Sequence, residues 1–222
     1  MKLTFALLLA PIAAFAFGGW AVVTVDDLPE YVVTGRAVEI PFSVRQHGVT
    51  LLSNLTPRVT MRAGGSESVA SVRAGSQPGH YIATWTAPRA DYWSIRIHSG
   101  FRDSENSLLP LRVVAAGAPA PRSMPDVERG QKLFFAKGCV TCHMRGDAGV
   151  DGMKIGPELT GKRYVPDYVA TFLDDPDSSP LSKATSTSAR MPKLDLKQRE
   201  IASLVAFLNS EGQVAGVHRQ WR

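Results

Sequence analysis

The chain has 222 residues, of which 44% are hydrophobic and 20% charged, a composition that excludes a disordered or collagen-like protein. Its length fits two compact domains of about a hundred residues each. The formal net charge of +5 forms no concentrated basic stripe, and the chain carries no nucleic-acid reading motif, so we expect no nucleic acid among its partners.

The first residues have the features of an export signal. Lys2 is a positive start, residues 3–17 are apolar, and Ala14-Phe15-Ala16 fits the small-x-small cleavage rule. We therefore expect residues 1–16 to be a signal peptide and the mature protein to be periplasmic, or to lie on the extracytoplasmic face of the cytoplasmic membrane. The alternative is an uncleaved anchor, because the apolar character continues to Val23 and reaches about the twenty residues that span a bilayer.

Residues 17–116 consist of short runs in which apolar and polar side chains alternate, broken by Gly, Pro, Ser and Asn. Such alternation predicts antiparallel strands with one face in the core. About seven strands in a hundred residues indicate an all-β immunoglobulin-like sandwich. The expected strands are residues 21–25, 37–45, 58–62, 69–73, 81–86, 92–98 and 111–114.

An Ala/Pro-rich stretch without periodicity follows at residues 117–125. This composition is typical of a semi-rigid spacer, and we place the domain boundary there. From residue 126 to 222 the apolar spacing becomes helical, which predicts an all-α second domain. Its expected helices are residues 126–137, 166–173 and 196–210, with a Ser/Thr/Pro-rich loop at 174–189.

The chain has two cysteines, Cys139 and Cys142, which are two residues apart and are followed at once by His143. Thiols at this spacing can add to the two vinyl groups of one porphyrin while the adjacent imidazole binds the iron. A redox dithiol or half of a zinc site would need a βαβ pattern or a second cysteine pair, and the sequence has neither. The motif therefore predicts one covalently attached haem c.

A six-coordinate iron needs a second axial ligand from elsewhere in the chain. Met191 comes at the end of the long loop, where Pro192 restricts the backbone, and it is the expected ligand. Its thioether would raise the reduction potential relative to a nitrogen ligand. The other candidates, which the chain places less well, are Met144, Met153 and His218.

Residues 126–212 resemble a class I, mono-haem cytochrome c in four motifs that occur in the family's order. The first is the attachment motif, and the second is a helix crossing formed by Gly130, Phe134 and Phe207. Residues 155–159 are similar to the family's Gly-Pro-x-Leu, and residues 189–192 to its Met-Pro ligand loop.

This resemblance has two implications for the site. It implies that Pro157 packs on the haem, and that a nearby carbonyl accepts a hydrogen bond from the second ring nitrogen of His143. The site predicted from the sequence is therefore Cys139, Cys142 and Pro157 for haem binding, with His143 and Met191 as iron ligands.

A single haem with an available methionine ligand predicts an electron carrier and not an enzyme. The expected partners are redox proteins, in particular a respiratory or photosynthetic membrane complex on which the sandwich docks, because a free shuttle has little use for a hundred extra residues. Membrane association would come through that partner or an uncleaved N-terminus. The alternatives are a free periplasmic shuttle, a peroxidase-like haem enzyme and a copper-binding sandwich, whose candidate ligands are His47, His80, His98 and Met61.

Overall fold

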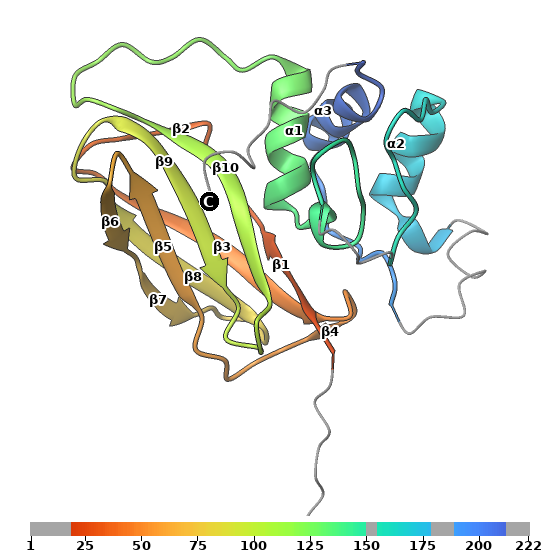
Figure 1. Cartoon of the computed structure of the whole chain (residues 1–222), viewed down its shortest axis with the longest axis horizontal. Helices are drawn as coiled ribbons and strands as arrows, with labels where there is room; N and C mark the ends of the chain where they lie inside the picture. The colour runs from red at the N-terminus through yellow and green to blue at the C-terminus, as the bar shows by residue number, and fades with distance from the viewer. Residues whose placement is uncertain (1–18, 150–154, 179–188, 212–222) are drawn as a thin grey trace, which may run out of the picture.

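The computed structural model describes residues 19–149, 155–178 and 189–211, and these form a sheet-rich half and a helical half (Figure 1). The expected signal peptide, together with Met153 and His218, lies outside the described residues. None of the helices in the described ranges is long and apolar enough to cross a membrane.

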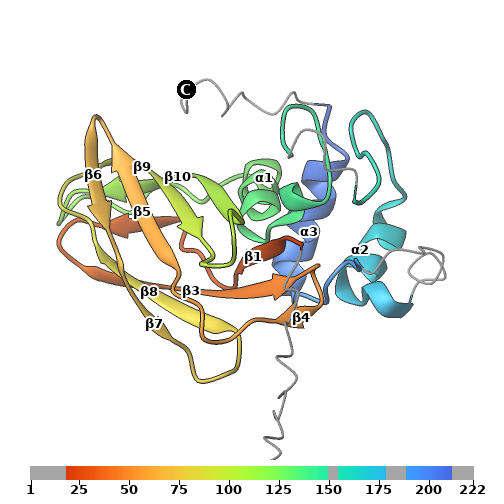
Figure 2. The same ribbon diagram turned by 60° about the horizontal axis from the view of Figure 1, so that its bottom comes forward.

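The N-terminal domain is a sandwich of two five-stranded sheets (Figures 1 and 2). One sheet has the order β1-β3-β8-β7 with β4 paired to β3, and the other has the order β2-β10-β9-β5-β6. The pairing is antiparallel except between β2 and β10. Within the described residues the strands are β1 Ala21–Val25, β2 Tyr31–Val33, β3 Ala37–Gln46, β4 Thr50–Leu51, β5 Arg58–Ala63, β6 Ser66–Val69, β7 Ser71–Ala74, β8 His80–Thr86, β9 Asp91–His98 and β10 Glu105–Val114.

The all-β prediction is confirmed, but the expected number of about seven strands was too low. The run at residues 69–73 belongs to two strands, β6 and β7, which lie in different sheets. The chain changes sheets at Ala70, which is buried and donates its backbone N–H to the carbonyl of Val59. Strands β2 and β4 have three and two residues, too few to produce a visible alternation.

The sandwich core follows from the alternation that the sequence shows. Along β9, Trp93, Ile95 and Ile97 point into the core and are fully buried. Tyr92, on the opposite face of the same strand, is exposed. Trp93 meets Trp85 of β8 edge to face, with ring centroids 5.3 Å apart. Two buried aromatic rings, one from each sheet, therefore pack together in the core of the sandwich.

The C-terminal domain is helical, as predicted, with α1 Asp126–Ala136, α2 Pro166–Asp174 and α3 Gln198–Leu208. Two short 3₁₀ turns accompany them, η1 Cys139–Thr141 and η2 Pro176–Ser178. Helices α1 and α3 cross at Gly130, where any Cβ atom would collide with the carbonyl oxygen of Ser203. The rings of Phe134 and Phe207 pack against each other beside this crossing, with their centroids 5.6 Å apart. The predicted helix contact is therefore confirmed.

The two domains pack directly against each other, with α1 beside β10 (Figures 1 and 2). Leu109 of β10 belongs to the apolar cluster of the helical domain, and Ala136 of α1 belongs to the core of the sandwich. The stretch at residues 117–125 contains no helix or strand and joins the domains without separating them. Shared burial of apolar side chains explains this close contact.

Buried polar groups fix the relative orientation of the domains. Lys137, which is 4% exposed, lies 2.9 Å from a carboxylate oxygen of Glu200 and donates to the carbonyl of Asp26 at 2.8 Å. The side-chain amide of Asn106 donates to the carbonyls of Val23 and Phe135, one in each domain. Because buried charges and amides need their partners, these contacts hold the two domains in one arrangement.

Candidate haem-binding site

The attachment motif lies on a single helical turn at the end of α1. Gly138 has a φ of 76°, the left-handed conformation that commonly ends a helix, and η1 begins directly after it. The backbone N–H groups of Cys142 and His143 both donate to the carbonyl of Cys139, at 3.1 and 2.9 Å. Because residues three and four apart share a face of a helical turn, the two thiols and the imidazole emerge on the same side.

The imidazole of His143 is held by a backbone carbonyl. Its Nδ1 lies 3.0 Å from the carbonyl oxygen of Pro157, so Nδ1–H is the donor and the neutral ring has its lone pair on Nε2. Burial lowers the pKa of His143, against the opposing effect of the Pro157 carbonyl. The neutral imidazole with one free nitrogen is the form that binds a metal.

Gly156 provides the space that this ring needs. A Cβ atom at this position would collide with Cε1 and Nδ1 of His143. The N–H of Gly156 donates to the carbonyl of Cys142 at 2.8 Å, so the Gly-Pro segment is tied to the attachment turn by its backbone. The glycine of the predicted Gly-Pro-x-Leu motif therefore lets the segment lie flat against the histidine.

The two thiols form no disulfide and are half-buried. Burial and the neighbouring Cys142 raise the pKa of Cys139 to about 12, and burial raises that of Cys142 to about 11. Both sulfurs are thus protonated at neutral pH. This donor set of two thiols and one neutral imidazole on one turn fits a haem c.

Met191, the predicted second ligand, packs against the same apolar cluster as Cys139 of the attachment turn. It is half-buried, and Leu159 also borders this cluster of the helical domain. The structure thus brings Cys139, Cys142, His143 and Pro157 together and places Met191 at the same cluster. The iron-ligand roles of His143 and Met191 stay predictions.

Arg145 is a site residue that the sequence analysis missed. It is buried, and its Nη2 donates to the carbonyls of Phe207 and Ser210 at 2.6 and 2.8 Å. Its guanidinium also lies over the Phe207 ring at 4.4 Å. Arg145 therefore binds the segment after the attachment motif to the C-terminal end of α3, where a cation is favourable. A lone arginine in a glycine-rich loop carries no sequence signal for such a role.

The copper candidates of the sandwich have other surroundings. His80 lies 3.4 Å from Asp26, His98 lies 3.1 Å from Glu105, and Met61 is fully buried in the core. Within the described ranges, no three His, Cys, Asp or Glu side chains are grouped to hold a metal ion. His80 and His98 therefore each contact a different carboxylate, and the ring of His47 packs against that of Trp20, with centroids 5.6 Å apart.

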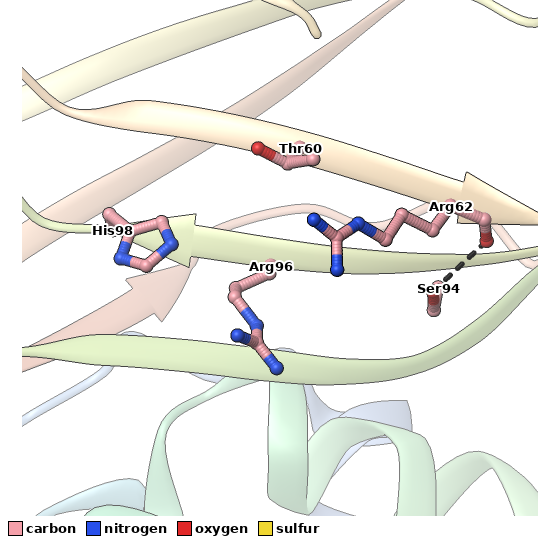
Figure 3. Close-up of a pocket in the computed structure, with 5 residues that line it drawn as sticks. All are labelled: Thr60, Arg62, Ser94, Arg96 and His98. Carbon is pink, nitrogen blue, oxygen red and sulfur yellow. Dashed lines mark hydrogen bonds between the residues drawn. The ribbon is translucent and has the colours of Figure 1, made fainter. Parts of the chain in front are cut away.

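A small hollow on the outer face of β5 and β9 holds His98 beside two arginines (Figure 3). Its lining also includes Thr60 and Ser94, and Ser94 donates its hydroxyl to the carbonyl of Arg62. Arg62 lies 2.6 Å from a carboxylate oxygen of Glu67, and Arg96 lies 3.8 Å from one of Glu105, so both arginines of this hollow are paired with carboxylates.

Residues 127–211 match the family model of cytochrome c. This match includes the attachment turn, the Gly-Pro segment and Met191. The C-terminal domain is therefore a cytochrome c domain, and the protein combines it with an N-terminal β-sandwich.

No curated protein matches the chain, whereas many solved structures resemble it, among them three at low sequence identity. The Lin-41 filamin domain is 14% identical over 45% of this chain and 86% of its own, with a TM-score of 0.30. Domains 4 and 5 of the S-layer protein SbsC are 20% identical over 42% of this chain and 44% of their own, with a TM-score of 0.32. The ZirS C-terminal domain is 10% identical over 51% of this chain and 82% of its own, with a TM-score of 0.32.

Proposed function

We propose that this protein is a mono-haem c-type cytochrome that transfers single electrons outside the cytoplasm. The cytochrome c domain supports haem-based electron transfer. The observation that carries the proposal is the turn in which the N–H groups of Cys142 and His143 donate to the carbonyl of Cys139, with Nδ1 of the imidazole held by the carbonyl of Pro157.

Each residue of the site has a defined task in this proposal. Cys139 and Cys142 would bind the porphyrin covalently, and His143 and Met191 would bind the iron from opposite sides. When bound, the haem supplies a one-electron couple. The Pro157 carbonyl keeps His143 in the required tautomer, and the surrounding apolar cluster limits the access of water to the site. A haem held by both His143 and Met191 would transfer electrons without turning over a substrate.

We propose further that the sandwich docks the cytochrome on a membrane respiratory or photosynthetic complex. The hydrogen bonds of Lys137 to the Asp26 carbonyl and of Asn106 to the carbonyls of Val23 and Phe135 support this role, because they join the sandwich to the helical domain rigidly. A rigid module that binds a partner would present the haem edge in a constant orientation.

Production in a bacterial host that attaches haem to exported proteins tests the proposed function. We expect a haem-stained band in a denaturing gel, and its loss in the Cys139→Ala, Cys142→Ala double variant. The oxidised protein should show the weak red-edge absorption band of iron–methionine ligation, and the Met191→Ala variant should not. A high-spin spectrum in the unaltered protein would contradict the carrier and favour a peroxidase-like enzyme.

Isolation from native membranes tests the docking role. An affinity-tagged chain should recover a membrane complex together with the haem-stained band. The cytochrome domain alone is not a suitable control, because its surface toward the sandwich is buried in the intact chain. Recovery of a monomer that fractionates with no membrane complex would instead identify a free shuttle.

A further inference from the structure

The turn between β3 and β4 of the sandwich lies against the segment that carries Met191. His47 and Gly48 have φ values of 54° and 75°, and Val49 N–H donates to the carbonyl of Gln46 at 2.9 Å to close the turn. A Cβ atom on Gly48 would lie 2.6 Å from the carbonyl oxygen of Arg190 and 3.6 Å from Cδ of Pro192. The turn therefore contacts the residues on both sides of Met191.

A further contact joins the sandwich to the same segment, because Nζ of Lys197 lies 3.7 Å from a carboxylate oxygen of Asp27. The charge of Asp195 also acts on the guanidinium of Arg45 near the end of β3: burial lowers the pKa of Arg45, and the negative charges of Asp26 and Asp195 partly oppose this effect. The sandwich thus contacts residues 190–197 near both ends of the segment.

The opposite side of residues 190–197 packs on the helical domain. Leu196 is buried in its apolar cluster, and Met191 and Leu194 are half-buried against it. Lys193 also faces the helical domain, with its Nζ 3.8 Å from a carboxylate oxygen of Asp175. The segment is thereby held between the two domains, with its apolar side chains toward the helices and the carbonyl of Arg190 toward the sandwich.

We infer that the β3–β4 turn is a positioning element for the methionine ligand, which it keeps in place by pressing residues 190–192 toward the helical domain. This inference rests on the proposed function, because it takes Met191 to be an iron ligand. A ligand on a long connection between two helices must be ordered by its surroundings, since a free loop loses conformational entropy when it closes. The sandwich is then part of the haem site, in addition to any docking role.

The variant Gly48→Ala tests this inference, with Gly65→Ala as its matched control. Gly65 lies in the β5–β6 turn with a φ of 78°, and nothing lies within 4 Å of its Cβ position. Both substitutions therefore place alanine in the same strained conformation, but only the one at position 48 pushes on the backbone of Arg190. The difference between them isolates the contact with the ligand segment.

The measurement is the binding of free imidazole to the oxidised holoprotein, followed through loss of the iron–methionine band. Imidazole competes with Met191, so a poorly positioned methionine is displaced more easily. We expect Gly48→Ala to bind imidazole about tenfold more tightly than the unaltered protein, equivalent to ~1.4 kcal/mol, and Gly65→Ala to bind it as the unaltered protein does.

A second variant covers the case in which Gly48→Ala does not fold. Asp195 has a φ of 48°, which asparagine also adopts readily, so Asp195→Asn removes the charge facing Arg45 without changing the backbone. We expect a smaller increase in imidazole affinity of the same sign.

Two results would overturn the inference, and they can be told apart. Equal imidazole affinities in the unaltered protein, Gly48→Ala and Asp195→Asn would overturn it while the electron-transfer function stands. Absence of the iron–methionine band in the unaltered protein would remove Met191 as a ligand, and with it both the ligand assignment and this inference.

Discussion

Nδ1 of His143 lies 3.0 Å from the carbonyl oxygen of Pro157, and this contact determines which ring nitrogen can bind iron. A carbonyl only accepts hydrogen bonds, so Nδ1 carries the proton and Nε2 has the lone pair. The segment that supplies the carbonyl is itself fixed to the attachment turn by the bond from Gly156 N–H to Cys142. One local unit of the chain therefore prepares the histidine as a ligand.

The first prediction concerns Gly156. A methyl group at this position would collide with the imidazole, so Gly156→Ala should displace His143 and lower the fraction of protein that carries haem. We expect a destabilisation of about 1–3 kcal/mol, as for other overpacked sites. Gly161→Ala is the control for backbone strain, because it places alanine at a φ of 66° while nothing lies within 4 Å of that Cβ position. The ratio of haem to protein absorbance measures the effect, and equal ratios in both variants would refute the role of Gly156.

The second prediction concerns Arg145. Arg145→Ala should destabilise the cytochrome domain by about 2–3 kcal/mol, because it removes the charged hydrogen bonds to the carbonyls of Phe207 and Ser210 and the guanidinium that covers the Phe207 ring. The control is Arg163→Ala, which removes an exposed ion pair with Glu211 and should change the stability by less than about 1 kcal/mol. Unfolding by urea gives both values. A loss for Arg145→Ala no larger than that of the control would show that the contacts with α3 are dispensable.

The third prediction concerns the ion pair between Lys137 and Glu200, which joins the end of α1 to α3. Lys137→Met should cost about 3 kcal/mol, because the carboxylate of Glu200, whose side chain is only 15% exposed, loses its cationic partner. Adding Glu200→Gln should recover part of this loss, since the amide keeps the hydrogen bond to the Lys197 N–H and has no charge. A double-mutant cycle measured by urea unfolding tests the pair. Additive effects of the two changes would contradict the coupling.

The fourth prediction concerns pH and Glu30, which pairs with Arg129 across the domains at 2.9 Å. Burial tends to raise the pKa of Glu30, but the hydrogen bonds from Arg129 and Met124 and the charges of Arg129 and Arg199 outweigh it, so the pKa lies below its ordinary value of 4.5. The stabilisation is therefore fully present above pH 4.5 and is lost as the pH falls through the lowered value.

Glu30→Gln should remove this part of the pH dependence. The free energy of unfolding, measured from neutral pH to below pH 4.5, should fall less steeply in the variant than in the unaltered protein. The control is Glu39→Gln, which affects an exposed ion pair with Arg73. If Glu30→Gln and the unaltered protein lose stability in parallel, the interdomain pair does not contribute to acid sensitivity.

Much of this architecture could be predicted from the sequence because it depends on local patterns. Alternating side chains predicted most of the sandwich strands, and helical spacing predicted α1, α2 and α3. The crossing at Gly130 with Phe134 and Phe207 was predicted from the family resemblance and is confirmed. In each case the residues that carry the signal are the residues that make the contact.

The remaining features depend on contacts between distant parts of the chain. Arg145 is bound by carbonyls more than sixty residues away, and nothing near it in the sequence indicates this. Gly48 meets Arg190 only because the sandwich packs on the helical domain. The Ala/Pro-rich stretch suggested separated domains, whereas the interface depends on scattered residues such as Asn106 and Lys137. Packing between two domains has no period, so the sequence pattern did not reveal it.

The mass of the intact protein tests the central claim most directly. The chain is exported in a host that attaches haem, denatured to remove any non-covalent ligand, and measured by mass spectrometry. We predict the mass of the polypeptide plus one haem, and the mass of the polypeptide alone for the Cys139→Ala, Cys142→Ala double variant. An unaltered protein that retains no haem after denaturation would contradict the assignment of this chain as a mono-haem c-type cytochrome.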